Sequence, residues 1–368
     1  MTNYLLAGGG TGGHVNPLLA LAERIRLNEP ESKVFALGTS EGLESKLVPE
    51  RGFDLLTIER LPFPRKFGAY ALKFPFSFYR AVKAIQTMIS ERQIEVVVGF
   101  GGYASAPAYV AARRSKIPYI IHEANALPGL ANKLGAKNAA AVAVAFKSTK
   151  LANAQLSGMP LRAEIENAVS VSKKSDSRMA LGLEPDTATL LVTGGSLGAR
   201  SINSAIDQSM SSLDAAGVQV LHIIGANSEL PEVRTKSLVR IKYCDQMDLA
   251  ISAADLAVCR SGASTVCEFG SLGLPSVFVP YPVGNGEQRF NAADLIEAGG
   301  AILVDDVHFT SDFVRDEVIP LISNSKRLKA MSFAAKAASI SNGTQRLYEL
   351  VRSVLPNKAK APNSVDPR

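Results

Sequence analysis

The sequence predicts an α/β protein of two domains, each built on a parallel β-sheet with flanking helices. The chain has 368 residues, which is more than one hydrophobic core usually holds. Short apolar runs alternate with helical stretches, an order typical of right-handed crossovers between parallel strands. A strand, a glycine-rich turn and a helix open the chain, and the same series begins again at residue 189. We therefore expect two Rossmann-like domains.

In the first half, apolar runs of strand length are separated by stretches with helical character. The expected strands are 4–7, 34–37, 94–99 and 119–122, and the expected helices are 18–27, 104–114 and 128–137. Residues 157–188 are polar and broken, which indicates a junction. Beyond it, residues 189–203 form the second strand, glycine turn and helix, and further strands are expected at 219–224, 256–259, 276–279 and 301–304.

Composition limits the classes of function. With 46% hydrophobic and 20% charged residues, the chain has the composition of an ordinary soluble α/β protein. Its three cysteines (Cys244, Cys259 and Cys267) and four scattered histidines show no metal-ligand spacing, so we expect no metal site and a reducing compartment. Neither a signal peptide nor an apolar run of about 18 residues is visible. The net charge of +6 favours anionic partners.

The first glycine loop raises the question of a redox cofactor. Residues 8–17 read GGGTGGHVNP and contain the G-x-G-x-x-G pattern of dinucleotide-binding folds. Such folds also need an acidic residue at the end of the second strand to bind the ribose. Thr39 and Ser40 occupy that place, with Glu41 as a late substitute. The loop is therefore expected to bind a phosphate group at a helix N-terminus, unless its glycines only turn the chain.

His14 follows this loop at the helix entrance. A lone histidine there is often a capping or core residue. The positive end of the helix dipole, however, favours the neutral imidazole that a general base requires. At the carboxyl end of a strand it would also face the crevice where open α/β sheets bind ligands.

The second half carries a more specific group of residues. Residues 258–275 read VCRSGASTVCEFGSLGLP, so a strand ends in a serine–glycine turn and a helix with small residues at its entrance. Its free N–H groups are suited to a diphosphate. One turn on, Glu268 can accept hydrogen bonds from ribose hydroxyls, although alone it would be a solvated helix residue. Gln288 and Asn291, spaced i and i+3, can contact one sugar.

Residues 61–83 combine aromatic and basic side chains, and no acidic residue occurs between Glu59 and Glu91. This composition is typical of docking on an anionic membrane surface. The alternative is an internal helix with a solvated basic face, and nucleic acid is disfavoured because no recognised binding fold accompanies the stretch. The basic residues are Arg65, Lys66, Lys73, Arg80 and Lys83.

In combination, five motifs resemble those of the MurG glycosyltransferase family, which adds N-acetylglucosamine to the lipid-linked muramyl-pentapeptide precursor of peptidoglycan. They are GGTGGH at 9–14, GGY at 101–103, HE-x-N at 122–125, GGS-x-GA at 194–199 and CRSGA-x-T at 259–265. The resemblance implies a GT-B architecture with a central cleft, on the cytoplasmic face of the bacterial membrane. It implies an acceptor domain at 1–157, a UDP-sugar domain at 158–342 and a helix at 343–355 that crosses back. We expect residues 356–368 to be a disordered tail.

The same resemblance implies the site residues. UDP-N-acetylglucosamine would be held by Arg162, Ser196, Cys244, Ala263, Ser264, Thr265, Glu268, Gln288 and Asn291. Thr11, Gly12, Gly13 and Asn125 would complete the cleft. An inverting displacement needs one base and neither a metal nor a cofactor, because UDP leaves readily. We expect His14 to be that base, with Glu123 and Tyr103 as alternates or orienting residues.

Three alternatives remain open at this point. A nicotinamide-linked oxidoreductase would use the first glycine loop. A UDP-N-acetylglucosamine 2-epimerase of the same architecture would act without a lipid acceptor. A non-catalytic sugar-nucleotide sensor at the membrane would release no UDP.

Overall fold

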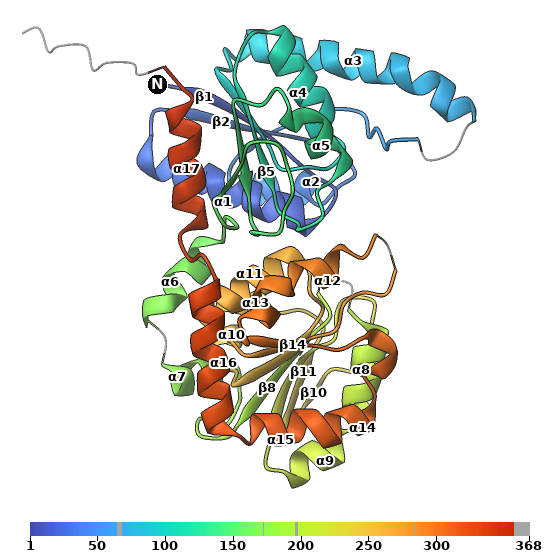
Figure 1. Ribbon diagram of the computed structural model, residues 1–368, viewed down its shortest axis with the longest axis vertical. Coiled ribbons are helices and arrows are strands. Elements are labelled where there is room, and N and C mark those ends of the chain that lie inside the picture. Colours follow the sequence, from blue (N-terminus) through green and yellow to red (C-terminus); the bar gives the residue numbers. More distant parts are fainter. Residues whose placement is uncertain (65–67, 172, 196–197, 284, 357–368) are drawn as a thin grey trace, which may run out of the picture.

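The computed structural model describes residues 1–64, 68–171, 173–195, 198–283 and 285–356, and it contains two stacked lobes (Figure 1). Each lobe has a seven-stranded sheet. The first has the order β3-β2-β1-β4-β5-β6-β7, and the second β10-β11-β9-β8-β12-β13-β14. All pairings are parallel except that between β10 and β11. The predicted α/β class with two Rossmann-like sheets is confirmed.

The strands are short and largely buried, as expected for parallel sheets covered by helices on both faces. The first sheet contains β1 (Asn3–Ala7), β2 (Lys33–Gly38), β3 (Asp54–Thr57), β4 (Val96–Gly99), β5 (Tyr119–Glu123), β6 (Ala141–Val144) and β7 (Ala154–Leu156). The second contains β8 (Thr189–Thr193), β9 (Gln219–Ile223), β10 (Val233–Arg234), β11 (Leu238–Ile241), β12 (Leu256–Cys259), β13 (Ser276–Phe278) and β14 (Ala301–Leu303).

Helices cover both sheets. Those of the first lobe are α1 (Gly12–Asn28), α2 (Glu44–Glu50), α3 (Ala69–Glu91), α4 (Ser105–Arg114) and α5 (Leu130–Ala136). Those that follow are α6 (Ala163–Val171), α7 (Lys174–Ala180), α8 (Arg200–Gln208), α9 (Met210–Ala215), α10 (Met247–Ala253), α11 (Ala263–Leu272), α12 (Glu287–Asn291), α13 (Ala293–Glu297), α14 (Ser311–Phe313), α15 (Ile319–Ile322), α16 (Ser325–Ala338) and α17 (Gly343–Ser353). A 3-10 turn (Asp306–His308) and a π-helical turn (Val314–Val318) flank α14.

Every predicted strand overlaps an observed one, but five strands were missed: β3, β6, β7, β10 and β11. They have two to four residues each, too few for a periodic pattern to stand out. The predicted junction at 157–188 contains two helices, α6 and α7. Helix α1 begins at Gly12, earlier than the predicted residue 18. The predicted start was too late because the first turn contains two glycines, which have low helix propensity.

The last helix joins the two lobes. Helix α16 packs in the second lobe, and α17 continues alongside α1 of the first (Figure 1). Leu347 and Val351 of α17 are fully buried in the same cluster as Leu18 and Leu21 of α1. Within the described part of the chain, no helix is both long and apolar enough to span a bilayer.

Candidate active site

The predicted motifs follow the central strands of both sheets. In each sheet the strand order reverses between two adjacent strands, β1 and β4 in the first and β8 and β12 in the second. Ligands of open α/β sheets bind beyond the carboxyl ends of such strands. The first glycine loop follows β1, Gly101 follows β4, the second glycine loop follows β8, and Ser261 follows β12.

His14 lies in the first turn of α1 and is half-buried. Its Nδ1 is 3.0 Å from the carbonyl oxygen of Gly9 and 3.3 Å from the hydroxyl of Thr11. A carbonyl oxygen can only accept, so Nδ1 carries the proton and donates it. In the neutral ring Nε2 is then an unprotonated acceptor, which is the form a general base needs. Nε2 has no hydrogen-bond partner among the described residues.

The turn after β4 packs directly on His14. A Cβ atom on Gly101 would lie 3.0 Å from Nε2 of His14, and one on Gly102 would lie 2.5 Å from the Gly9 carbonyl oxygen. Both glycines have positive φ, at 95° and 80°, which also favours glycine. Tyr103 is half-buried beside Gly10, and the guanidinium of Arg60 lies 5.1 Å from its ring centre.

Glu123 is a buried carboxylate at the end of β5. Its Oε1 accepts a bond from the Asn125 N–H, and its Oε2 accepts bonds from the Gly129 N–H and Asn132 Nδ2, each at 2.9 Å. Asn132 in turn accepts a 2.7 Å bond from Tyr109. Because both oxygens are engaged, this geometry favours the orienting role for Glu123, which holds the loop carrying Asn125.

The entrance of α11 has the features of an anion site. Its first residue is Ala263, and the N–H groups of the first turn have no partners within the helix. The hydroxyls of Ser261 and Ser264 are buried and have no hydrogen-bond partner among the described residues. Thr265 is half-buried beside Gly262. A buried hydroxyl without a partner costs free energy, which a bound acceptor group would recover.

Glu268 lies one turn further along α11 and is buried. Its Oε1 is 3.4 Å from Nη2 of Arg162, which comes from the segment before α6. Burial raises the pKa of the Glu268 carboxyl above its usual value, and the nearby guanidinium only partly opposes this. Burial likewise raises the pKa of the Cys244 thiol, which the Arg162 charge also partly opposes. The structure thus brings Arg162 and Glu268 together, and Cys244 is buried in the same hydrophobic cluster as Ala263 at the start of α11.

Asn291 connects the two lobes. It is fully buried at the end of α12, and its Oδ1 accepts a 2.8 Å bond from the Ala126 N–H of the first lobe. Its Nδ2 lies 3.3 Å from Asn125 Oδ1 and 3.4 Å from the Ser261 carbonyl oxygen. Gln288 is half-buried on the same helix and accepts a bond from the Tyr281 N–H. The entrance of α11 therefore lies next to the loop after β5.

Four further predicted residues belong to the two glycine motifs. Thr11 is exposed at the N-cap of α1, with Gly12 and Gly13 half-buried in the first turn. Ser196 lies outside the described residues. Arg260, by contrast, is turned into the fold: it donates to the carbonyl oxygens of Val279 and Pro280 and pairs with Asp306.

Sequence reasoning missed Glu44, which lies beneath the first glycine loop. Its Oε2 accepts a 2.8 Å bond from the Gly10 N–H, and its Oε1 accepts bonds from the N–H and hydroxyl of Thr39. Burial raises the pKa of this carboxyl, but the hydrogen bonds from Gly10 and Thr39 outweigh it and lower the pKa overall. The sequence signals are Gly9, Gly38 and Gly42, where a Cβ atom would collide with the Glu44 side chain.

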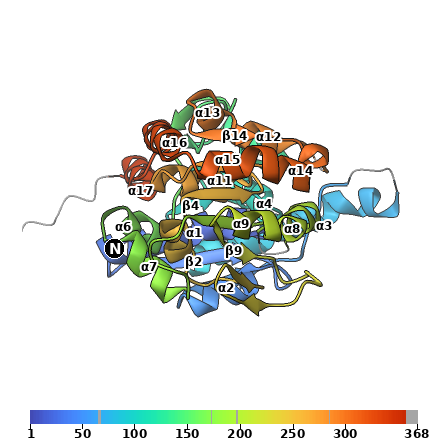
Figure 2. The same cartoon turned by 90° about the horizontal axis from the view of Figure 1, so that it is seen from below.

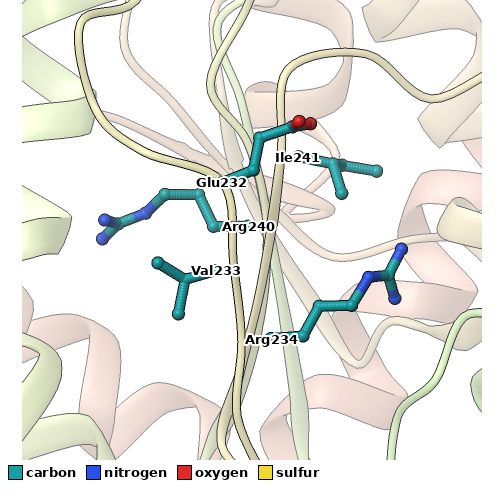
Figure 3. A pocket seen from close by; sticks show the side chains of 5 residues that line it. All are labelled: Glu232, Val233, Arg234, Arg240 and Ile241. Carbon is teal, nitrogen blue, oxygen red and sulfur yellow. The ribbon is translucent and has the colours of Figure 1, made fainter.

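A hollow at the outer edge of the second sheet contains none of the predicted site residues. It lies over β10 and β11 and is lined by Glu232, Val233, Arg234, Arg240 and Ile241 (Figure 3). Three strands separate β10 from β12 in the sheet order. We therefore place the candidate active site at the loops between the lobes.

Comparison with known proteins agrees with this arrangement. Residues 4–144 match the glycosyltransferase family 28 N-terminal domain, and residues 189–347 match the glycosyltransferase family 28 C-terminal domain. A curated relative from Leifsonia xyli subsp. xyli is 51% identical over 96% of this chain and 99% of its own. One from Clavibacter sepedonicus is 51% identical over 98% and 99%. Both are named UDP-N-acetylglucosamine--N-acetylmuramyl-(pentapeptide) pyrophosphoryl-undecaprenol N-acetylglucosamine transferase.

A solved structure agrees as well. The crystal structure of Acinetobacter baumannii MurG has a TM-score of 0.78 and 26% identity, covering 96% of this chain and all of its own. The GT-B architecture is thereby confirmed. The chain belongs to glycosyltransferase family 28 and, within it, to the MurG family.

Proposed function

We propose that this chain transfers N-acetylglucosamine from UDP-N-acetylglucosamine to the muramyl 4-hydroxyl of undecaprenyl-pyrophosphoryl-MurNAc-pentapeptide. The names of its relatives give the same donor, acceptor and transferred group. One observation carries the proposal beyond the family match. Asn291 links the Ser261 turn at the entrance of α11 to the Asn125 loop of the first lobe. The helix entrance proposed to bind phosphate thus adjoins the loop after β5. Asn132, which follows that loop, and the candidate base His14 both lie beside Gly101.

In this proposal the donor binds chiefly to the second lobe. Its diphosphate accepts bonds from the first N–H groups of α11 and from the unpartnered hydroxyls of Ser261 and Ser264. Glu268 accepts bonds from the ribose hydroxyls, and the cation of Arg162 lies beside it. We assign Thr265 and Ser196 to the phosphates, Cys244 to the uracil and Gln288 to the sugar. Asn291 is fully buried with both amide atoms bonded, so its part is to hold the entrance of α11 in place for the donor.

His14 is the proposed base. Nε2 takes the proton of the acceptor hydroxyl, whose oxygen attacks the anomeric carbon. The bond from that carbon to the UDP oxygen breaks, and UDP leaves with the electron pair. Attack from the face opposite to UDP inverts the anomeric centre. The α11 N-terminus and Arg162 stabilise the charge that develops on the leaving diphosphate, so the step needs neither a metal nor a cofactor.

A coupled assay of UDP release tests this function. With UDP-N-acetylglucosamine and the muramyl-lipid, UDP is released at a rate that depends on both. His14→Ala lowers kcat by about 10²–10⁴-fold, the usual contribution of a general base, and leaves donor affinity unchanged. His308→Ala, at an exposed histidine, is the matched control. Near-normal turnover in His14→Ala rules out His14 as the base.

The same assay separates the alternatives. UDP release without any lipid acceptor favours an epimerase-type reaction, and donor binding without UDP release favours a sensor. An absorbance change that depends on nicotinamide favours an oxidoreductase. None of these outcomes is expected.

We further propose that the chain docks peripherally on the anionic cytoplasmic surface of the membrane through residues 61–83. Helix α3 projects from the side of the first lobe (Figures 1 and 2). Its inner face packs on α4, burying Ala81, Val82 and Ile85. Among the basic residues of this stretch, Arg65 and Lys66 lie outside the described residues.

The outer face of α3 is apolar and basic. Leu72, Phe76, Tyr79 and Lys83 are all exposed, and their spacing of four, three and four residues places them on one stripe of the helix. The exposed cations Lys73 and Arg80 flank this stripe. A face that combines exposed apolar groups with cations is suited to a bilayer interface.

Flotation with anionic and neutral vesicles tests the docking. Phe76→Ser and a double charge reversal, Lys73→Glu with Arg80→Glu, should each weaken binding to anionic vesicles about tenfold or more. Phe333 on α16 is 78% exposed, against 67% for Phe76, so Phe333→Ser is a matched control that leaves flotation unchanged. Equal binding by the charge-reversed variant contradicts the proposal.

A further inference from the structure

We infer that Glu44 is a positioning residue that acts on His14 through the peptide group between Gly9 and Gly10. The inference rests on the proposed role of His14 as the base. It assigns to the first glycine loop a second task besides binding phosphate: the loop connects a buried carboxylate to the imidazole.

The geometry consists of two hydrogen bonds to one peptide group. The Gly10 N–H donates to Oε2 of Glu44 at 2.8 Å. The Gly9 carbonyl oxygen, on the other side of the same peptide bond, accepts from Nδ1 of His14 at 3.0 Å. Because the N–H and C=O of a peptide group are coupled by resonance, a carboxylate at the N–H increases the negative charge on the carbonyl oxygen.

Glu44 is built to remain in this position as an anion. Two bonds from Thr39 hold Oε1, at 2.9 Å from the N–H and 2.8 Å from the hydroxyl. Gly9, Gly38 and Gly42 enclose the carboxylate so closely that a Cβ atom on any of them would collide with it. The lowered pKa of the carboxyl means that its charge is present throughout the neutral range.

The consequence for His14 has two parts. A more negative Gly9 oxygen holds the proton on Nδ1 and so keeps the tautomer in which Nε2 is free. It also stabilises the imidazolium that forms when Nε2 takes a proton, which makes the ring a stronger base. Carboxylates commonly do this to catalytic histidines by direct contact with Nδ1. Here one peptide group stands between the two side chains.

Other ionisable groups face this part of the site. Tyr103 comes from the turn after β4, with the Arg60 cation on its ring, and Glu123 is connected through Asn132, which lies beside Gly101. The test must therefore remove the Glu44 charge and leave these groups in place. Glu44→Gln does so with little change in shape.

The first measurement is the pH dependence of kcat. In Glu44→Gln the imidazole is a weaker base, so the acidic limb of the profile moves to lower pH by about half a unit, the effect of one charge across a peptide group at a partly solvated site. A purely structural role lowers kcat equally at every pH and leaves the limb in place. Glu50→Gln, which removes an exposed charge from the same helix, is the matched control and leaves the acidic limb of the pH profile in place.

The second measurement follows the His14 ring directly by NMR. The His14 signal is the one missing in His14→Ala, and burial lowers the pKa of His122 to about 4 and that of His222 to about 3, which keeps both out of the neutral range. In Glu44→Gln the midpoint of the His14 titration falls by about half a pH unit. In Glu44→Asp, which keeps the charge, it stays nearer to the wild-type value even if the fold is less stable.

An unchanged midpoint in a folded Glu44→Gln protein overturns the inference. Because the NMR titration needs no substrate, it remains valid if His14→Ala proves active and the proposed base is wrong. Conversely, if His14→Ala loses activity and the His14 midpoint does not move in Glu44→Gln, the positioning role of Glu44 is rejected. The role of His14 as the base is then retained.

Discussion

Removing the Asn291 side chain should destabilise the protein before any substrate is bound. Asn291 is fully buried and makes hydrogen bonds to Asn125 and Ala126 of the first lobe and to Ser261 of the second. Asn291→Ala deletes all three. The Ala126 N–H, bonded at 2.8 Å, loses a strong acceptor, and the other two bonds are longer and weaker.

The magnitude follows from these bonds. A buried polar group left without a partner costs about 1–3 kcal/mol, so one short and two long bonds amount to about 2–4 kcal/mol. For a domain of this size each kcal/mol lowers Tm by about 2–4 °C, so the predicted decrease in Tm is roughly 4–16 °C. Gln288→Ala, on the same helix but half-buried with one backbone bond, should cost below about 1 kcal/mol.

Calorimetry of the ligand-free variants measures this effect, and steady-state kinetics with UDP-N-acetylglucosamine measures donor KM and kcat. If Asn291→Ala melts at the wild-type temperature and only its donor KM rises, the residue is a sugar ligand alone. The interlobe hydrogen bonds of Asn291 would then contribute nothing to stability, contrary to this prediction. A lower Tm together with a raised KM is expected, because the same amide holds the α11 entrance against the first lobe.

Two further predictions concern the base and the ribose site. Gly102→Ala places a methyl group 2.5 Å from the Gly9 carbonyl oxygen and 3.3 Å from Nδ1 of His14, so kcat should fall by about 10–100-fold in the UDP-release assay. Gly299→Ala is the control: it has the same φ of 80° with open space around it and should keep full activity. Glu268→Gln should weaken donor binding by more than tenfold in calorimetric titration. The folded-state pKa of Glu268 is raised, so ionisation of this carboxyl lowers the stability of the wild-type protein as pH rises. The Tm of Glu268→Gln relative to that of the wild type should therefore increase from acid to neutral pH. A Tm difference that does not change with pH contradicts that assignment.

Most of the architecture could be read from the sequence because it depends on local patterns. Buried five-residue strands with a run of three or four apolar side chains, such as β1 and β8, stand out between polar turns. The glycine turns mark where each of them ends. The entrance of α11 was recognisable from the residues that follow β12, since an N-terminal turn of small residues is a local feature as well. The helical character of 163–171 escaped notice because its polar surroundings resembled a linker.

Only the tertiary structure decided which side chains meet. The partners Arg162 and Glu268 are 106 residues apart, and Asn291 bonds to a backbone group 165 residues away. The strand order brings β1 beside β4 and so sets Gly102 against His14, and packing places Glu44 beneath Gly10. Local propensity acts over a few residues, whereas these contacts depend on how whole sheets and lobes pack. The sequence by itself therefore determined the elements and the chemical groups, and packing determined which of those groups act together.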